Sequence, residues 1–141
     1  MNYPKFLSKN DKIAYVAPSF GCVYEPYYTR LQSSIKVMTN RGYQIECGPN
    51  VYKDEAIGRS NSPIECAKEI NHYFNKDDCR ALLSVGGGEM QFETLPYIDF
   101  EKIKNSEPKW FNGFSDNTNY SFLLTTLSDV ASIYGHCAGS F

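Results

Sequence analysis

The sequence predicts an α/β fold with a parallel, Rossmann-like or flavodoxin-like sheet of about five strands, flanked by helices. Short apolar or alternating runs recur along the chain, and segments with helical spacing of apolar residues lie between them. Strands that alternate with helices pair in parallel through right-handed crossovers. No internal repeat, low-complexity tract or interior linker is visible, so we expect one domain.

Composition and charge narrow the class of protein. The 141 residues, 42% hydrophobic and 21% charged, suit one globular domain with a hydrophobic core. A net charge of −2 argues against nucleic-acid binding, because phosphate contacts require a basic face. No apolar run approaches the length of a membrane span or signal peptide, so we expect a cytoplasmic protein without membrane contact. Five cysteines without a CxxC pair indicate free thiols rather than disulfides or a zinc site.

The first half of the chain contains two expected strands and two expected helices. Residues 12–17 form a short apolar run, which is typical of a buried strand. Apolar residues then recur with helical spacing over 31–38, and an alternating pattern predicts a second strand at 43–47. After a loop, Ser62 and Glu65 have the spacing of a capping box, so a second helix should begin there.

The second half repeats the same alternation. Strands are expected at 80–85, 109–114 and 130–134, and helices are expected at 90–95, from Asp99 and from Asp116. In an open parallel sheet, functional residues collect beyond the carboxyl ends of the strands. Three segments with unusual sequences fall at that edge, namely 17–21, 86–89 and 113–116.

The segment Gly-Phe-Ser-Asp at 113–116 has the context of a nucleophile elbow. It lies between an expected strand and an expected helix, where a sharp turn would raise the Ser115 hydroxyl above the sheet edge. Asn117 departs from the usual pattern, which places a small residue there. The motif alone leaves open a simpler interpretation, in which Ser115 and Asp116 only cap the following helix.

The glycine run at 86–88 allows a close approach of the backbone to a ligand. Neither a complete GxGxxG nor a GxxxxGK[ST] motif is present, so the evidence for nucleotide binding is weak. Backbone N–H groups of such a turn can form an oxyanion hole. A plain strand-to-helix turn fits the spacing equally well.

Two histidines are candidates for a general base. His72 falls in a polar stretch of an expected helix, so we expect it to be solvated. His136 follows the last expected strand, at the same sheet edge as Ser115. A serine nucleophile needs a base within hydrogen-bond reach, and no motif marks His136 for that role.

Taken together, the motifs resemble the LD-carboxypeptidase and microcin C immunity peptidases. The order and spacing of several segments carry this resemblance far more specifically than any one segment does. They are Ala-Pro-Ser at 17–19, Gly-Tyr at 42–43 followed by Gly-Pro at 48–49, the glycine block at 84–89, Leu-Pro-Tyr-Ile-Asp-Phe at 95–100, and the nucleophile segment at 109–118.

The resemblance implies roles for individual residues. Ser115 would be the nucleophile, and the backbone N–H of Asp116 with that of Gly87 or Gly88 would form the oxyanion hole. Many members of the family have Tyr-Gly where this chain has Gly88-Glu89, so the identity of the second donor stays open. Ser19 and Glu89 would face the substrate cleft.

The resemblance also implies how the chain is organised. Family members take a histidine and a glutamate from a C-terminal domain, and His136 does not match that histidine. We therefore expect residues 1–141 to be the N-terminal, nucleophile-bearing domain without its C-terminal domain, and to be inactive alone. The implied reaction transfers an acyl group to water without a metal or organic cofactor. The substrate would be a murein L,D-peptide or a peptidyl- or aminoacyl-nucleotide.

Two other interpretations remain at this stage. The chain could be a non-catalytic module that keeps the fold and serves ligand binding or homodimerisation. It could also be a self-sufficient hydrolase in which His136 activates Ser115.

Overall fold

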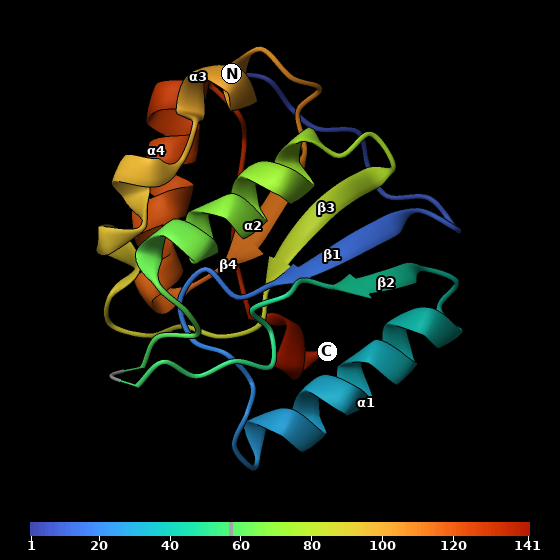
Figure 1. Ribbon diagram of the computed structural model, residues 1–141. Helices are drawn as coiled ribbons and strands as arrows, with labels where there is room; N and C mark the ends of the chain where they lie inside the picture. The colour runs from blue at the N-terminus through green and yellow to red at the C-terminus, as the bar shows by residue number, and fades with distance from the viewer. Residues whose placement is uncertain (57) are drawn as a thin grey trace.

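A five-stranded, all-parallel sheet forms the centre of the computed structural model, which describes residues 1–56 and 58–141 (Figure 1). The order across the sheet is β2-β1-β3-β4-β5, and each neighbouring pair is parallel. The predicted α/β fold with a parallel sheet is therefore confirmed. The strands are β1 (Lys12–Val16), β2 (Gln44–Cys47), β3 (Cys79–Ser84), β4 (Trp110–Gly113) and β5 (Ile133–Tyr134).

Helices cover both faces of the sheet. The α-helices are α1 (Tyr27–Asn40), α2 (Pro63–Asn75), α3 (Phe100–Lys104) and α4 (Thr118–Ser128). Helices α2, α3 and α4 pack on one face, and α1 packs on the other (Figure 1). Strand β1 shows why, because alternate side chains of a strand point to opposite faces. Ile13 and Tyr15 join the core beneath α1, whereas Ala14 and Val16 join the core beneath α2 and α4.

Most element boundaries agree with the sequence prediction. Ser62 caps α2 by accepting a hydrogen bond from the Glu65 backbone N–H at 3.4 Å, as the capping box predicts. The helix expected at 90–95 is instead two 3₁₀ turns, η1 (Gln91–Glu93) and η2 (Leu95–Tyr97). Pro96 accounts for the difference, because it has no N–H to continue an α-helical ladder.

The last strand is shorter than expected. Residues 130–134 were predicted to be a strand, but β5 contains only Ile133 and Tyr134. Val130 instead forms an isolated parallel bridge with Asn2, and the Ala131 N–H donates to the Asn2 carbonyl at 2.9 Å. The N-terminal segment thus occupies backbone groups that the sequence pattern assigned to the sheet.

The strand order defines one point in the sheet at which the direction of winding reverses. The chain moves from β1 outward to β2 and then returns past β1 to β3, so the direction of winding reverses between β1 and β3. In open α/β sheets, ligands bind in the crevice at the carboxyl ends of strands where this reversal occurs. Among the described residues, no helix is long and apolar enough to span a membrane.

Candidate active site

Ser115 lies at a sharp turn between β4 and α4. Strand β4 ends at Gly113, and the 3₁₀ turn η3 (Ser115–Asn117) leads directly into α4. The φ angle of Ser115 is 61°, in the left-handed region that is unfavourable for residues other than glycine. The side chain is exposed. A strained, exposed serine between a strand and a helix is the geometry of a nucleophile elbow.

The helix-cap interpretation of this motif fits the structure poorly. The N-cap residue of α4 is Asn117, and α4 has no side-chain cap hydrogen bond at that position. Within the described part of the chain, the Ser115 hydroxyl has no hydrogen-bond partner. The serine therefore contributes an unengaged hydroxyl, not a cap.

Asn117 occupies the position where the elbow pattern favours a small residue. Its side chain is fully buried, and its Nδ2 donates to the carbonyls of Gly86 at 2.9 Å and Phe114 at 3.1 Å. Its Oδ1 accepts a hydrogen bond from Gln91 Nε2 at 3.0 Å. Gly113 provides the room, since a Cβ built there would lie 2.9 Å from the Asn117 Cβ. The small residue of this elbow is thus Gly113, and Asn117 links the elbow to the glycine turn.

The Asp116 carboxylate joins three segments of the chain. Its Oδ2 accepts hydrogen bonds from the Ser19 hydroxyl and from the Gln91 backbone N–H, the latter at 2.9 Å. Its Oδ1 accepts from Asn119 Nδ2 at 2.9 Å. The loop after β1, the segment after the glycine turn and the start of α4 are therefore held together next to Ser115.

The two glycines proposed for the oxyanion hole face different groups. A Cβ built on Gly87 would lie 3.1 Å from the Ser115 Cβ and 3.3 Å from its Oγ. A Cβ built on Gly88 would instead lie 2.1 Å from the Ser19 Oγ and 3.3 Å from an Asp116 carboxylate oxygen. In the described residues, the N–H groups of Gly87, Gly88 and Asp116 have no acceptor. Gly87 is the glycine that abuts the serine.

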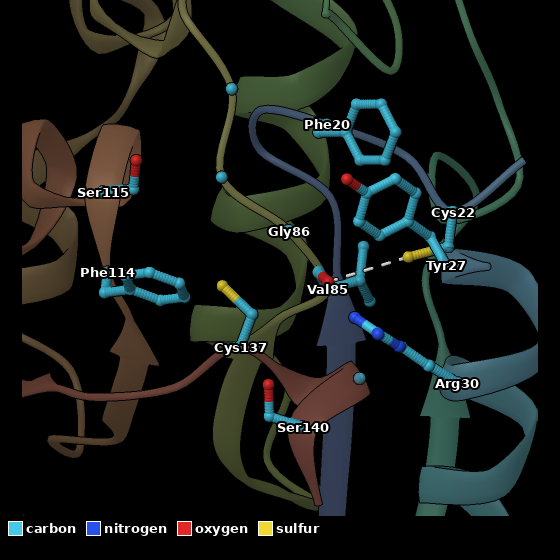
Figure 2. Close-up of a pocket in the computed structure, with 13 residues that line it drawn as sticks. Phe20, Cys22, Tyr27, Arg30, Val85, Gly86, Phe114, Ser115, Cys137 and Ser140 are labelled. Atoms are coloured by element: carbon cyan, nitrogen blue, oxygen red, sulfur yellow. Dashed lines mark hydrogen bonds between the residues drawn. The ribbon is translucent and has the colours of Figure 1, made fainter. Parts of the chain in front are cut away.

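A cavity of about 420 Å³ opens beside Ser115 (Figure 2). Loops that follow β1, β3, β4 and β5 surround it, so it lies at the carboxyl edge where the winding reverses. In Figure 2, Phe114 and Ser115 stand on one side, and Tyr27 and Arg30 of α1 stand on the other. The lining residues are Phe20, Cys22, Tyr27, Arg30, Val85, Gly86, Gly87, Gly88, Phe114, Ser115, Cys137, Gly139 and Ser140.

Two residues expected at the substrate cleft lie outside this lining. Ser19 is 1% exposed and its hydroxyl donates to Asp116, so it helps to hold the residue that follows Ser115. Glu89 is exposed on the glycine loop and does not line the cavity.

Neither histidine lines the cavity. His136 is exposed, and its ring packs edge-on against Phe114 with 5.8 Å between the ring centroids. In the part of the chain that the structure describes, no hydrogen bond joins its imidazole to Ser115; only its backbone carbonyl is engaged, by Asn112 Nδ2 at 2.7 Å. His72 is exposed on α2 against Tyr73, as its polar surroundings in the sequence predict.

The two cysteines that line the cavity are held as neutral thiols. Burial raises the pKa of Cys22 to about 12, and its Sγ donates to the Val85 carbonyl at 3.6 Å. Burial also raises the pKa of Cys137. A thiol is a weak nucleophile unless it ionises, so burial disfavours a nucleophilic role for both cysteines.

A buried glutamate anchors the loops that lead to the site. Glu69 of α2 accepts hydrogen bonds from the backbone N–H of Ala17 at 2.7 Å and of Asn50 at 2.9 Å. A Cβ on Gly48 would lie 2.2 Å from its carboxylate, so glycine is required there. Burial raises the pKa of Glu69 to about 7, although the Asn50 and Ala17 backbone N–H groups oppose this rise. Ala17 follows β1 and Asn50 follows β2, so Glu69 fixes the path of the chain after both strands.

Several of these residues carried no signal in the sequence. Arg30, Cys22 and Cys137 belong to segments without a motif, and only the tertiary structure brings them to one cavity. Asn117 was visible only as a departure from a pattern. Within residues 1–56 and 58–141, no group of three or more His, Cys, Asp and Glu side chains is arranged to hold a metal ion.

The fold and the elbow define an α/β domain that presents a serine between a parallel strand and the following helix. A model of the LD-carboxypeptidase N-terminal domain, peptidase family S66, matches residues 13–135. The chain belongs to this family, which confirms the resemblance carried by its motifs.

Curated relatives extend well beyond the matched region. A Vibrio cholerae protein named as a carboxypeptidase is 29% identical over 136 residues, which is 96% of this chain and 40% of that protein. The microcin C7 self-immunity protein MccF of Escherichia coli is 24% identical over 106 residues, or 75% of this chain and 30% of MccF. The chain spans at most about 40% of the length of these two relatives.

Solved structures share the fold. An MccF-like protein from Bacillus anthracis superposes with a TM-score of 0.91 at 22% identity, covering 99% of this chain and 42% of that one. The muramoyltetrapeptide carboxypeptidase from Oxalobacter formigenes has a TM-score of 0.73 at 26% identity, covering 90% of this chain and 40% of that one.

Proposed function

We propose that this chain supplies the nucleophile and the oxyanion donors of a serine peptidase of the LD-carboxypeptidase type. The observation that carries the proposal is the left-handed, exposed Ser115 at the end of β4, with Gly87 packed against it and a cavity beside it. Among the described residues, the N–H groups of Asp116 and Gly87 beside this serine have no acceptor. Membership of the family supports this assignment.

The chemistry is acyl transfer to water in two steps. The Ser115 Oγ attacks the carbonyl carbon of an amide while a base takes the hydroxyl proton, and the carbonyl oxygen becomes an oxyanion. The N–H groups of Asp116 and Gly87 stabilise that charge, and the amine leaves after it receives the proton. Water then attacks the acyl-enzyme, releasing the acid and restoring the hydroxyl.

The base comes from outside these 141 residues in this proposal. The Ser115 hydroxyl has no hydrogen-bond partner in the described residues, and the exposed imidazole of His136 packs against Phe114 instead. A histidine and a glutamate from a C-terminal domain would complete the triad, as the family resemblance implies. Loss of a triad base typically costs about 10⁴ in rate or more, so the chain alone should turn over little substrate.

Two substrate classes follow from the relatives. One solved relative is a muramoyltetrapeptide carboxypeptidase, which supports a murein L,D-peptide. Structures of MccF contain adenosine monophosphate or aspartyl sulfamoyl adenosine, which supports an aminoacyl- or peptidyl-nucleotide. Both classes contain an acyl group whose carbonyl carbon a serine can attack, so both are compatible with Ser115 as the nucleophile.

The test is serine acylation by a mechanism-based probe, read by intact mass. We would treat the chain alone, and the chain mixed with the part of the Vibrio cholerae relative beyond the matched region, with the same acyl-enzyme-trapping reagent. We expect one adduct, at Ser115, only in the mixture. The matched controls are Ser115→Ala, which should abolish the adduct, and Ser140→Ala, which removes another serine of the cavity and should not.

Other outcomes select the alternatives. Labelling of the lone chain that His136→Ala abolishes would mean that the chain carries its own base. An absence of labelling in both samples would favour a non-catalytic ligand-binding or dimerising module. An adduct that persists in Ser115→Ala would refute the nucleophile assignment.

A further inference from the structure

Arg30 is the charged side chain among the described residues that line the cavity beside Ser115. It lies in the first turn of α1. Figure 2 shows its side chain extending from α1 toward Val85, on the opposite side of the cavity from Ser115. A Cβ built on Gly139 would lie 3.7 Å from the Arg30 Cβ, so the η4 turn (Ala138–Ser140) packs against the base of this side chain.

In the described residues, no carboxylate neutralises Arg30. Arg59 and Arg80, by contrast, form ion pairs with Glu93 and Glu107. The nearest acid in the sequence, Glu25, accepts hydrogen bonds from the Thr29 backbone N–H at 3.3 Å and hydroxyl at 2.8 Å. The planar donor fork of Arg30 is therefore available to a ligand, and a guanidinium stays charged at physiological pH.

The remaining wall favours a ligand with one negative charge and an otherwise small, apolar body. Phe20 and Tyr27 form an edge-to-face pair with 5.3 Å between ring centroids, and Phe114 lines the opposite side. A single guanidinium pairs in bidentate fashion with one carboxylate.

We propose that Arg30 is a specificity-determining residue that binds the free carboxylate of a substrate's terminal residue while Ser115 attacks the preceding carbonyl. The proposal rests on the proposed function of Ser115. It explains at the level of one side chain why a terminal bond would be cleaved. The main-chain carboxyl group of an internal residue is consumed by the next peptide bond and cannot bind the guanidinium.

The test measures binding without turnover, on the Ser115→Ala variant of the chain. The probes are N-acetyl-L-lysyl-D-alanine and the same peptide with a C-terminal carboxamide, titrated by isothermal calorimetry or by amide chemical shifts. We expect the free acid to bind about tenfold more tightly than the carboxamide, because hydrogen bonds between charged partners are the stronger ones. Arg30→Gln should abolish this preference, and Arg30→Lys should restore part of it.

Arg41 provides the matched control, since it is an exposed arginine just after the other end of α1. Arg41→Gln should keep the full preference for the free acid. Circular dichroism would verify that each variant is folded. Because Ser115 is absent from the binding assay, a failed acylation experiment would leave this measurement interpretable.

Three results would overturn the proposal. The first is equal affinity for the acid and the carboxamide, or no saturable binding of either peptide. The second is an equal loss of preference in Arg30→Gln and Arg41→Gln. The third is Arg30-dependent binding of adenosine monophosphate that exceeds that of the free-acid peptide, which would assign the guanidinium to a phosphate instead.

Discussion

Ser115 combines an exposed hydroxyl with a backbone conformation that its own side chain disfavours. Its φ of 61° lies in the left-handed region, where the Cβ crowds the following carbonyl oxygen. A local sequence preference alone would not select this conformation. It persists because Asp116 and Asn117, which follow Ser115 directly, bind groups from other segments.

Ser115→Gly should therefore stabilise the chain relative to Ser115→Ala. Glycine has no Cβ to crowd in the left-handed region, so we expect a difference of about 1 kcal/mol in the free energy of unfolding. Urea denaturation of both variants measures it. If the alanine variant is as stable as the glycine variant, the elbow is not strained in solution.

Tyr120 carries a buried hydroxyl that is expected to lower the stability of the fold. Its hydroxyl is fully buried and has no hydrogen-bond partner among the described residues, and burial raises the pKa of its phenol well above the ordinary value. Its ring packs edge-on against Phe111 with 4.6 Å between centroids, so the aromatic body contributes to the core.

Tyr120→Phe should keep the ring and remove an unpaired polar group. We expect the free energy of unfolding to stay the same or to rise by about 1 kcal/mol, because a buried donor without an acceptor loses its hydration. Thermal and urea denaturation would show this. A loss of more than about 1 kcal/mol would mean that the hydroxyl has a partner in solution.

At the scale of elements, a few buried side chains hold the loops of the sheet edge in place. Asn117, at the start of α4, binds the glycine turn through the Gly86 carbonyl and η1 through Gln91. Gln91 in turn accepts from the Tyr120 backbone N–H at 3.1 Å. The elbow, the glycine turn and η1 thus form one hydrogen-bonded unit.

Asn117→Ala should disrupt that unit. It leaves the buried Gln91 Nε2 without its acceptor. It also removes one of two hydrogen bonds to the Gly86 carbonyl, which still accepts from the Ser84 hydroxyl at 2.9 Å. We therefore expect a loss of about 1–3 kcal/mol in the free energy of unfolding. The change should also lower acylation of Ser115 in the complemented sample. Asn105→Ala is the control, because Asn105 is exposed and binds only the Glu101 carbonyl. Similar losses in both variants would contradict the proposed role.

For the whole molecule, two glutamates impose opposite dependences of stability on pH. Hydrogen bonds from Lys76, with further ones from Lys12 and Tyr73, lower the pKa of Glu46 to about 2. Its contribution to stability is present above the ordinary pKa of 4.5 and is lost as pH falls toward 2.

Burial raises the pKa of Glu69 to about 7, so between pH 4.5 and 7 the folded chain holds a proton that the unfolded chain has released. Stability from this group is greatest below pH 4.5 and is lost as pH rises to about 7.

Glu69→Gln should remove the pH dependence of stability that arises from Glu69. In the wild-type chain we expect the free energy of unfolding to decrease between pH 4.5 and 7, and in the variant that slope should be smaller. Urea denaturation at a series of pH values measures both profiles. Glu65→Gln, an exposed change on the same helix, should leave the slope intact. Equal slopes in Glu69→Gln and wild type would show that Glu69 ionises normally.

The fold class, the family and most elements of this protein could be predicted from the sequence alone. Hydrophobic periodicity and capping signals are local, so the strand at 12–17 and the helix start at Ser62 were readable without the structure. The motif at 113–116 is also local, so it located the turn that carries Ser115.

The surroundings of that turn depend on tertiary contacts and could not be predicted from the sequence. A short motif does not show that Gly113 makes room for Asn117. Nor does it show that Gly87 contacts Ser115 while Gly88 faces Ser19. The pairing of Asn2 with Val130, where a longer last strand was expected, also appears only in the structure. Arg30 and Ser115 are far apart in the chain and share no motif, yet they line one cavity. The physical reason is that a parallel sheet brings the ends of distant strands to one edge, where contacts depend on strand order and not on sequence separation.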